Sequence, residues 1–267
     1  MFNIVLKRTF EEFSDNFKVA LSFGVLFIFV AIFVFFEQFF ISSGTVFLFF
    51  DINLFTLVGL ICALVFLYAF SFFISLSVYS IQRDIHRLTL DEYWSVLLKK
   101  GSLNIFIFYF FLVLLFFVLS ILGLTFSQVV FSSVVMFVIS TLLMYVPQSI
   151  IFDEVGVGYA IRESVSFWRK SFGVSFGILF LSTIALFLII LIEFVFDYFG
   201  FPGSIISFVL VLIFLIPFVE QMKSYAYILK NNLIRASEVS SARRKKKFVE
   251  PFERTTRLRE KNPRGKL

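Results

Sequence analysis

Long apolar runs alternate with short polar segments along most of the chain. The runs cover roughly 19–41, 53–80, 102–122, 126–146, 172–196 and 204–219, and the last continues as a helical pattern toward Asn232. A helix of about 20 apolar residues crosses the hydrocarbon core of a bilayer. The alternation therefore predicts an all-α, polytopic integral membrane protein with six transmembrane helices.

One polar pattern, E-x-x-S-x-x-x-K, stands immediately before three of these runs. Its copies are Glu11, Ser14 and Lys18; Glu92, Ser95 and Lys99; and Glu163, Ser166 and Lys170. These spacings fall within about 60° on one face of a helix. The opposite face of the third copy carries only large apolar side chains, namely Ile161, Val165, Trp168 and Phe172. Each copy therefore predicts a short amphipathic helix at the membrane surface that leads into a span.

The repeated pattern suggests three units, each an amphipathic interfacial helix followed by a helical hairpin. The units cover about 9–80, 89–147 and 158–232, and S-F-G-V-L-F at 22–27 is echoed by S-F-G-I-L-F at 175–180. Because no unit can bury its apolar faces alone, we expect the three to pack around a common pseudo-threefold axis. The six-span domain would then cover 1–235, and 236–267 would form a basic, disordered cytoplasmic tail.

Positive charges are strictly segregated along the chain. All 24 Lys and Arg lie in 1–18, 83–100, 162–170 and 223–267, whereas the loops after the first, third and fifth runs contain none. Lys and Arg accumulate in the cytoplasmic loops of membrane proteins. Both termini and the repeated helices are therefore predicted to be cytoplasmic.

Three acidic residues lie within or at the ends of apolar runs, namely Glu37, Glu193 and Glu220. Carboxylates at membrane depth are costly and often mark the path of an ion or a substrate. We therefore regard them as candidate pathway groups. The alternative is a plain boundary role, because all three fall near the ends of their runs.

A polybasic segment follows the last span closely. It consists of Arg243, Arg244, Lys245, Lys246 and Lys247. Such segments attract anionic lipid headgroups, and they also fix topology. The bilayer and its anionic headgroups are accordingly the partners that the sequence predicts, and it identifies no protein partner.

Composition narrows the function classes. The chain is 60% hydrophobic and 16% charged, whereas a soluble domain is about a quarter charged. Residues 243–267 hold 11 Lys or Arg and 3 acids, so the net charge of +6 belongs to the tail and does not indicate nucleic-acid binding. The single Cys62 and the single His86 stand far apart in the sequence, which predicts neither a metal site nor a cofactor.

The sequence G-V-S-F-G at 173–177 matches the G-x-S-x-G signature of serine hydrolases. That chemistry needs a strand–turn–helix context and a histidine base. Here the motif begins an apolar run, and His86 lies in another segment. The same residues also read as G-x-x-x-G, which lets two helices approach closely. We therefore predict that the protein is not an enzyme.

The segment from Pro147 onward resembles a known membrane domain. A span that ends in Pro, a short acidic stretch, a Gly and an A-x-x-x-S helix are matched by Pro147, Asp153, Glu154, Gly156, Ala160 and Ser164. This outline is similar to the membrane domain associated with glycerophosphoryl diester phosphodiesterases and to related uncharacterised six-span prokaryotic families. The resemblance implies that architecture in the plasma membrane of a prokaryote. It implies no activity, since these 267 residues hold no soluble phosphodiesterase domain.

The leading functional hypothesis is a non-enzymatic multi-pass membrane protein. It would organise lipid or a membrane partner through its cytoplasmic interfacial helices and basic tail. The alternative is a transporter or permease for a small solute or ion, with Glu37, Glu193 or Glu220 along its path. A membrane-embedded hydrolase is the third hypothesis, and it lacks a base.

Overall fold

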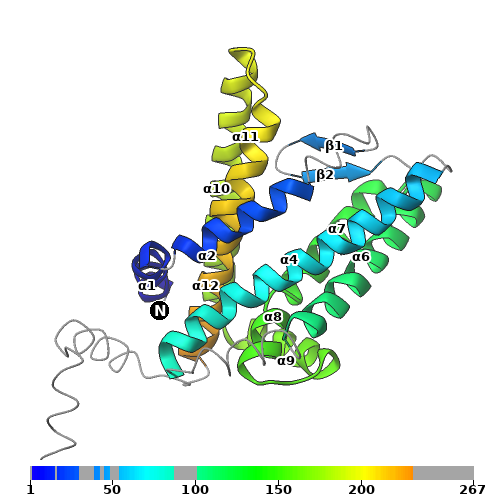
Figure 1. Cartoon of the computed structure of the whole chain (residues 1–267). Helices are drawn as coiled ribbons and strands as arrows, with labels where there is room; N and C mark the ends of the chain where they lie inside the picture. The colour runs from blue at the N-terminus through cyan, green and yellow to red at the C-terminus, as the bar shows by residue number, and fades with distance from the viewer. Residues whose placement is uncertain are drawn as a thin grey trace, which may run out of the picture. The chain divides into compact units, whose positions relative to one another are not determined.

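A computed structural model of the protein describes residues 2–15, 17–29, 39–42, 45–48, 54–86 and 101–230 (Figure 1). The chain forms two compact units, Met1–Tyr227 and Ile228–Leu267, and the described elements belong to the first apart from the final turn of α12. Within the described ranges, five helical stretches are long and apolar enough to cross a membrane: Val58–Ile81, Ser102–Thr125, Val129–Phe152, Phe172–Tyr198 and Gly203–Lys230. The prediction of a helical membrane protein is therefore confirmed.

The N-terminal part departs most from the prediction. Two helices and a 3-10 turn come first: α1 (Phe2–Asp15), α2 (Phe17–Ser22) and η1 (Phe23–Leu26). An antiparallel hairpin follows, made of two strands: β1 (Phe39–Ser42) and β2 (Thr45–Leu48). The predicted helical span over 19–41 is therefore wrong at its end. The aromatic and β-branched residues that made this stretch look like a span, such as Ile41, also favour strands.

The next helices follow the predicted runs, with one correction. α4 (Leu54–His86) packs against α6 (Ser102–Thr125), which packs against α7 (Val129–Leu142). A separate short helix, α8 (Val146–Phe152), then begins with Pro147 in its first turn. The prediction that Pro147 ends a span is wrong, because a first-turn residue needs no intrahelical N–H bond and proline suits that position.

The last hairpin consists of α10 (Phe172–Tyr198) and α11 (Gly203–Leu210). At its turn the N–H of Gly203 donates a hydrogen bond of 2.9 Å to Asp197 Oδ1. α11 continues through a π-helical turn, η3 (Val211–Leu215), into α12 (Ile216–Lys230). Pro217 lacks the N–H that would bond to the carbonyl of Ile213 in an α-helix, and this explains the wider turn.

The first and third copies of the repeated pattern have different settings. Glu163, Ser166 and Lys170 share one helix, α9 (Val157–Lys170), as predicted. In the first copy α1 ends at Asp15 and α2 begins at Phe17, so Lys18 lies on a different helix from Glu11 and Ser14. The single-helix prediction is wrong there, and Asp15, at which α1 ends, is a poor helix former. Glu92, Ser95 and Lys99 lie outside the described residues.

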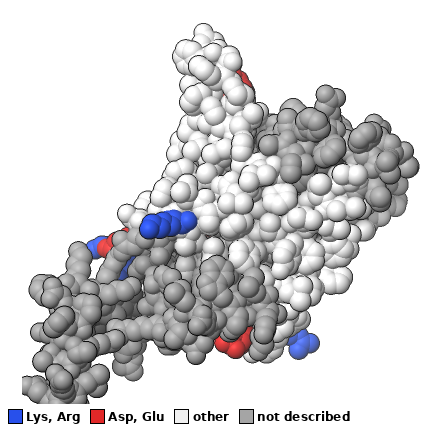
Figure 2. All heavy atoms as spheres, viewed as in Figure 1, with Lys and Arg blue, Asp and Glu red and all other residues white. Residues whose placement is uncertain are grey.

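The buried core joins η1 and one end of α4 and α6 to α8 and η3. Its members are large apolar side chains, including Phe23, Leu26, Ile74, Val78, Ile105, Ile151 and Leu212. Away from this core, α6, α7 and α10 expose residues such as Phe111, Phe131 and Phe187. Figure 2 shows the surface of the long helices almost free of charged atoms. This is the pattern expected of helices that face lipid.

Candidate functional site

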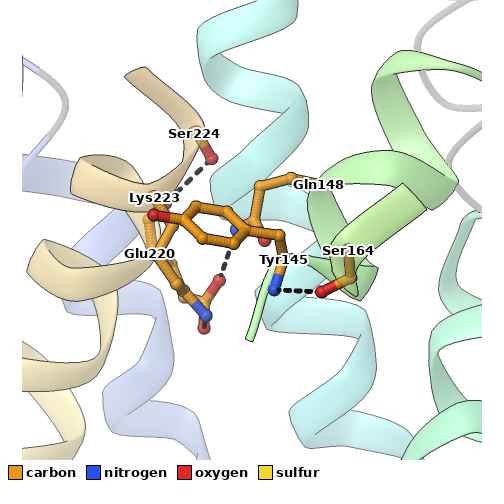
Figure 3. A network of polar contacts seen from close by, with 6 residues as sticks. All are labelled: Tyr145, Gln148, Ser164, Glu220, Lys223 and Ser224. Carbon is orange, nitrogen blue, oxygen red and sulfur yellow. Dashed lines mark hydrogen bonds and ion pairs between the residues drawn. The ribbon is translucent and has the colours of Figure 1, made fainter. Parts of the chain in front are cut away.

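A buried network of charged and polar side chains joins α12 to α8 (Figure 3). Lys223 Nζ lies 2.5 Å from Glu220 Oε1, and Gln148 Nε2 donates a hydrogen bond of 2.8 Å to Glu220 Oε2. Glu220 and Lys223 are each 6% exposed, and Gln148 is fully buried. Both oxygens of the Glu220 carboxylate therefore have partners, and Lys223 offsets its charge.

The helical repeat of α12 places this network on one face. The positions i, i+3, i+4 and i+7 are occupied by Glu220, Lys223, Ser224 and Tyr227. Ser224 Oγ donates a hydrogen bond of 2.8 Å to the main-chain carbonyl of Glu220. Removing one partner of a buried ion pair costs about 3–5 kcal/mol, because the other charge is left buried without a counter-ion. The contact that turns this face of α12 toward α8 is the hydrogen bond from Gln148.

Buried amide atoms on α8 and α12 have no hydrogen-bond partner among the described residues. Gln148 Oε1 accepts no hydrogen bond in the part of the chain that the structure describes, although Gln148 Nε2 is engaged. Gln221, the next residue on α12 after Glu220, is fully buried, and both of its amide atoms lack a partner among the described residues. Each such group costs about 1–3 kcal/mol. Ordered water commonly satisfies such atoms in folded proteins.

Ser164 of α9 holds together the junction between α7 and α8. Its hydroxyl donates a hydrogen bond of 2.7 Å to the carbonyl of Leu142, the last residue of α7, and accepts one of 3.2 Å from the N–H of Tyr145, which precedes α8. Backbone N–H and C=O groups that a helix break leaves without an intrahelical bond need such partners when they are buried. A fully buried serine from a third helix thus makes this break possible.

An aromatic cluster connects α9 to α12. The ring of Phe167 lies 4.4 Å from that of Tyr145 and 4.9 Å from that of Tyr227, measured between centroids. The hydroxyl of Tyr227 donates to Asp153 Oδ2, and Ser149 Oγ donates to the same oxygen at 3.1 Å. Asp153 is half-buried at the end of α8. Polar groups therefore continue along α12 from the buried Glu220 to the end of α8.

α9 has two opposite faces with different chemistry. One face is buried against the bundle through Ala160, Ser164 and Phe167. The other face lines a shallow hollow of about 440 Å³ with six residues: Ile161, Arg162, Val165, Ser166, Arg169 and Lys170. The sequence pattern grouped Ile161 and Val165 with Trp168 as the apolar face. In the structure the neighbouring positions Ala160, Ser164 and Phe167 are the fully buried ones, and Ile161 is partly buried against the core.

The outward face of α9 is strongly basic. Arg162, Arg169 and Lys170 form no ion pair with any residue in the described ranges. None of the side chains that line the hollow is acidic. Arg169 and Lys170 also stand in the last turn of α9, where cations are favoured by the helix dipole. Among the described residues, this face is therefore electropositive.

The remaining predicted site residues are less informative. Ser14 and Lys18 are exposed, and Glu11 Oε2 lies 3.9 Å from Arg8 Nη1. Glu193 is 8% exposed within α10. Glu37 and the polybasic residues Arg243, Arg244, Lys245, Lys246 and Lys247 lie outside the described residues. Glu220, also predicted as a pathway carboxylate, lies within the polar network that joins α12 to α8.

No protein-family model, curated protein or solved structure matches the chain. The described residues bring together no group of three or more His, Cys, Asp or Glu side chains. The described residues offer two chemically distinctive features, namely the basic outward face of α9 and the buried cluster around Glu220.

Proposed function

We propose that the protein is a non-enzymatic, multi-pass membrane protein that organises lipid through its interfacial helices and its basic tail. One observation carries the proposal, namely the hollow on α9 that Arg162, Arg169 and Lys170 line together with Ile161 and Val165. Cations beside apolar side chains complement an anionic lipid, which has a negative headgroup above acyl chains. The chemistry is that of binding, and it needs no nucleophile or base.

The connection of α9 to the next helix supports a lipid ligand. α9 ends at Lys170, and α10, which is long enough to span a membrane, begins at Phe172. If α10 spans the bilayer, the outward face of α9 would lie near the level at which that span leaves it, which is where headgroups lie. Each Lys or Arg at an anionic surface contributes about 1 kcal/mol to binding.

We further propose the finer architecture that the sequence suggested. The apolar run from Val19 would supply a sixth span, and the three units would descend from one duplicated hairpin of the type associated with glycerophosphoryl diester phosphodiesterases. Both termini and α9 would face the cytoplasm of a prokaryotic cell. The segregation of all 24 Lys and Arg supports this orientation. An even number of spans also places both termini on one side.

Cysteine labelling tests this topology. In a Cys62→Ser background, cysteines at Ser43 and Gly200 are expected to react with a membrane-impermeant maleimide from outside intact cells. Cysteines at Ser95 and Ser240 should react only after the membrane is opened. The expectation follows from the absence of Lys and Arg around the first two positions and their abundance around the others. Labelling of Ser95→Cys from outside would refute the orientation.

Lipid binding is expected to depend on the three cations of α9. The variant Arg162→Gln/Arg169→Gln/Lys170→Gln should bind a fluorescent phosphatidylglycerol about 100-fold more weakly than the unmodified protein, measured by titration in detergent. The matched control, Lys7→Gln/Arg8→Gln/Lys18→Gln, removes the same charge from α1 and α2. Its loss of lipid affinity should be at least tenfold smaller than that of the α9 variant, since these positions do not share one hollow.

Equal losses in the two variants would mean that net charge alone attracts lipid. Unchanged binding in the α9 variant would contradict the proposed function. The spans would then hold the function, and the alternative hypothesis, movement of a small solute or ion past Glu220, would take its place.

A further inference from the structure

The cations that line the hollow on α9 are divided between two positions along the helix. Arg162 stands at one end of the hollow, and Arg169 and Lys170 stand seven and eight residues later at the other. Seven helical residues rise about 10 Å and turn by almost two full turns, so the two arginines start nearly in line along the helix axis. All three cationic side chains are exposed. The hollow therefore presents positive charge from two separated places on one helix.

A hydroxyl group stands between these two places. Ser166 lines the hollow, four residues after Arg162 and three before Arg169, so it lies one helical turn from each. A serine hydroxyl both donates and accepts hydrogen bonds. The opposite face of α9 is anchored in the bundle, where Ser164 accepts a hydrogen bond from the N–H of Tyr145 (Figure 3). This anchor holds the order of cation, hydroxyl and cation on the outward side of α9.

A row of aromatic rings begins beside the apolar side of the hollow. The rings of Trp168, Phe172, Phe176 and Phe180 follow one another at centroid distances of 4.9, 6.0 and 6.4 Å. Trp168 lies one turn after Val165, which lines the hollow, and the three phenylalanines are exposed on α10, which is long enough to span a membrane. An apolar track that starts at a cationic hollow and follows a span suits the acyl chains of an anionic lipid.

We propose that the hollow of α9 binds a lipid whose headgroup carries two phosphates joined by a short hydroxylated linker. One phosphate contacts Arg162, and the other contacts Arg169 and Lys170, because guanidinium groups pair well with phosphate oxygens. Ser166 bonds to the linker, and the acyl chains lie along the aromatic row. This inference rests on the proposed function and narrows its ligand from anionic lipids in general to lipids with two phosphates. Once one phosphate is bound, the linker holds the second at a high effective concentration.

The test measures how well diphosphatidylglycerol and phosphatidylglycerol displace a fluorescent phosphatidylglycerol from the full-length protein in detergent. At equal phosphate concentration the unmodified protein should prefer diphosphatidylglycerol by at least about tenfold. Arg162→Gln removes the single cation at one end of the hollow, so the preference should fall to about twofold or less. The matched control Lys170→Gln also removes one charge but leaves an arginine at each end, so its preference should stay near about tenfold. The ratio of the two affinities cancels the general effect of a lost charge.

The outcomes separate this inference from the proposed function. If the unmodified protein binds both lipids with equal affinity, or if the two variants keep equal preferences, the two-phosphate ligand is overturned while lipid binding by α9 stands. The deacylated headgroup, bis(glycerophospho)glycerol, should compete at least about tenfold more weakly than the lipid, because it lacks the acyl chains. Equal competition would identify a soluble phosphate ligand and overturn the inference. Undiminished binding of both lipids to Arg162→Gln/Arg169→Gln/Lys170→Gln would reject the proposed function itself.

Discussion

Replacing Phe167 with alanine is expected to lower the free energy of unfolding by about 3–5 kcal/mol. The side chain is fully buried, and its ring lies 4.4 Å from the ring of Tyr145 and 4.9 Å from that of Tyr227. Alanine would leave a cavity where α9 contacts α12. The rigid helix break beside Tyr145 limits how far the neighbours can collapse into it.

Phe172 provides the matched control for this prediction. It lies five residues later, at the start of α10, and is 52% exposed. Phe172→Ala should lower the free energy of unfolding by about 1 kcal/mol or less, since the exposed part of its ring loses no protein contacts. SDS titration in mixed micelles, followed by far-UV circular dichroism, measures both. Equal losses would show that the cluster around Phe167 does not hold α9 in place.

The spans were predictable because their signal is local. The run that became α10 is bounded by Lys170 on one side and by Asp197 near the other, and a continuous apolar stretch of this length has few alternatives to a spanning helix. The same rule failed at the N-terminus, where Ile41 and Val46 pair across a β-hairpin. A run of Phe, Ile and Val fits a helix or a strand equally, and its pairing partner decides between them.

The break between α7 and α8 was not predictable from its own residues. Pro147 signals a boundary, but it does not say whether a helix ends or begins there. The deciding contact comes from Ser164, whose hydroxyl pairs with both sides of the break from another helix. The repeated pattern drew attention to the nearby Ser166, which faces outward instead. A shift of two positions on a helix exchanges a buried side for an exposed one, and sequence spacing alone does not fix that choice.

The candidate site was predictable only in part for the same reason. Glu220 was identified because a carboxylate within an apolar run is costly, and Lys223 was visible beside it. Gln148 lies 72 residues away along the chain and joins them only after folding. The basic face of α9 was present in the sequence as Arg162, Arg169 and Lys170. Its significance appeared once the structure showed that the opposite face packs inward and that no described acid neutralises these cations.

Removing Glu220 alone should be among the most damaging single changes in the spans. Glu220→Leu leaves the ammonium group of Lys223 buried without its counter-ion, and we expect a loss of about 3–5 kcal/mol in the free energy of unfolding. The double variant Glu220→Leu/Lys223→Met carries no unpaired charge and should lose only about 1–3 kcal/mol, because Gln148 Nε2 has then lost its acceptor.

Glu220→Leu, Lys223→Met and the double variant complete a double-mutant cycle, which SDS titration in mixed micelles measures. The coupling between the two positions should reach at least about 2 kcal/mol, a size expected of side chains in direct contact away from water. A loss below about 1 kcal/mol for Glu220→Leu is the size found for solvated ion pairs. Such a result would show that water reaches the pair and that the cluster is not a sealed part of the bundle.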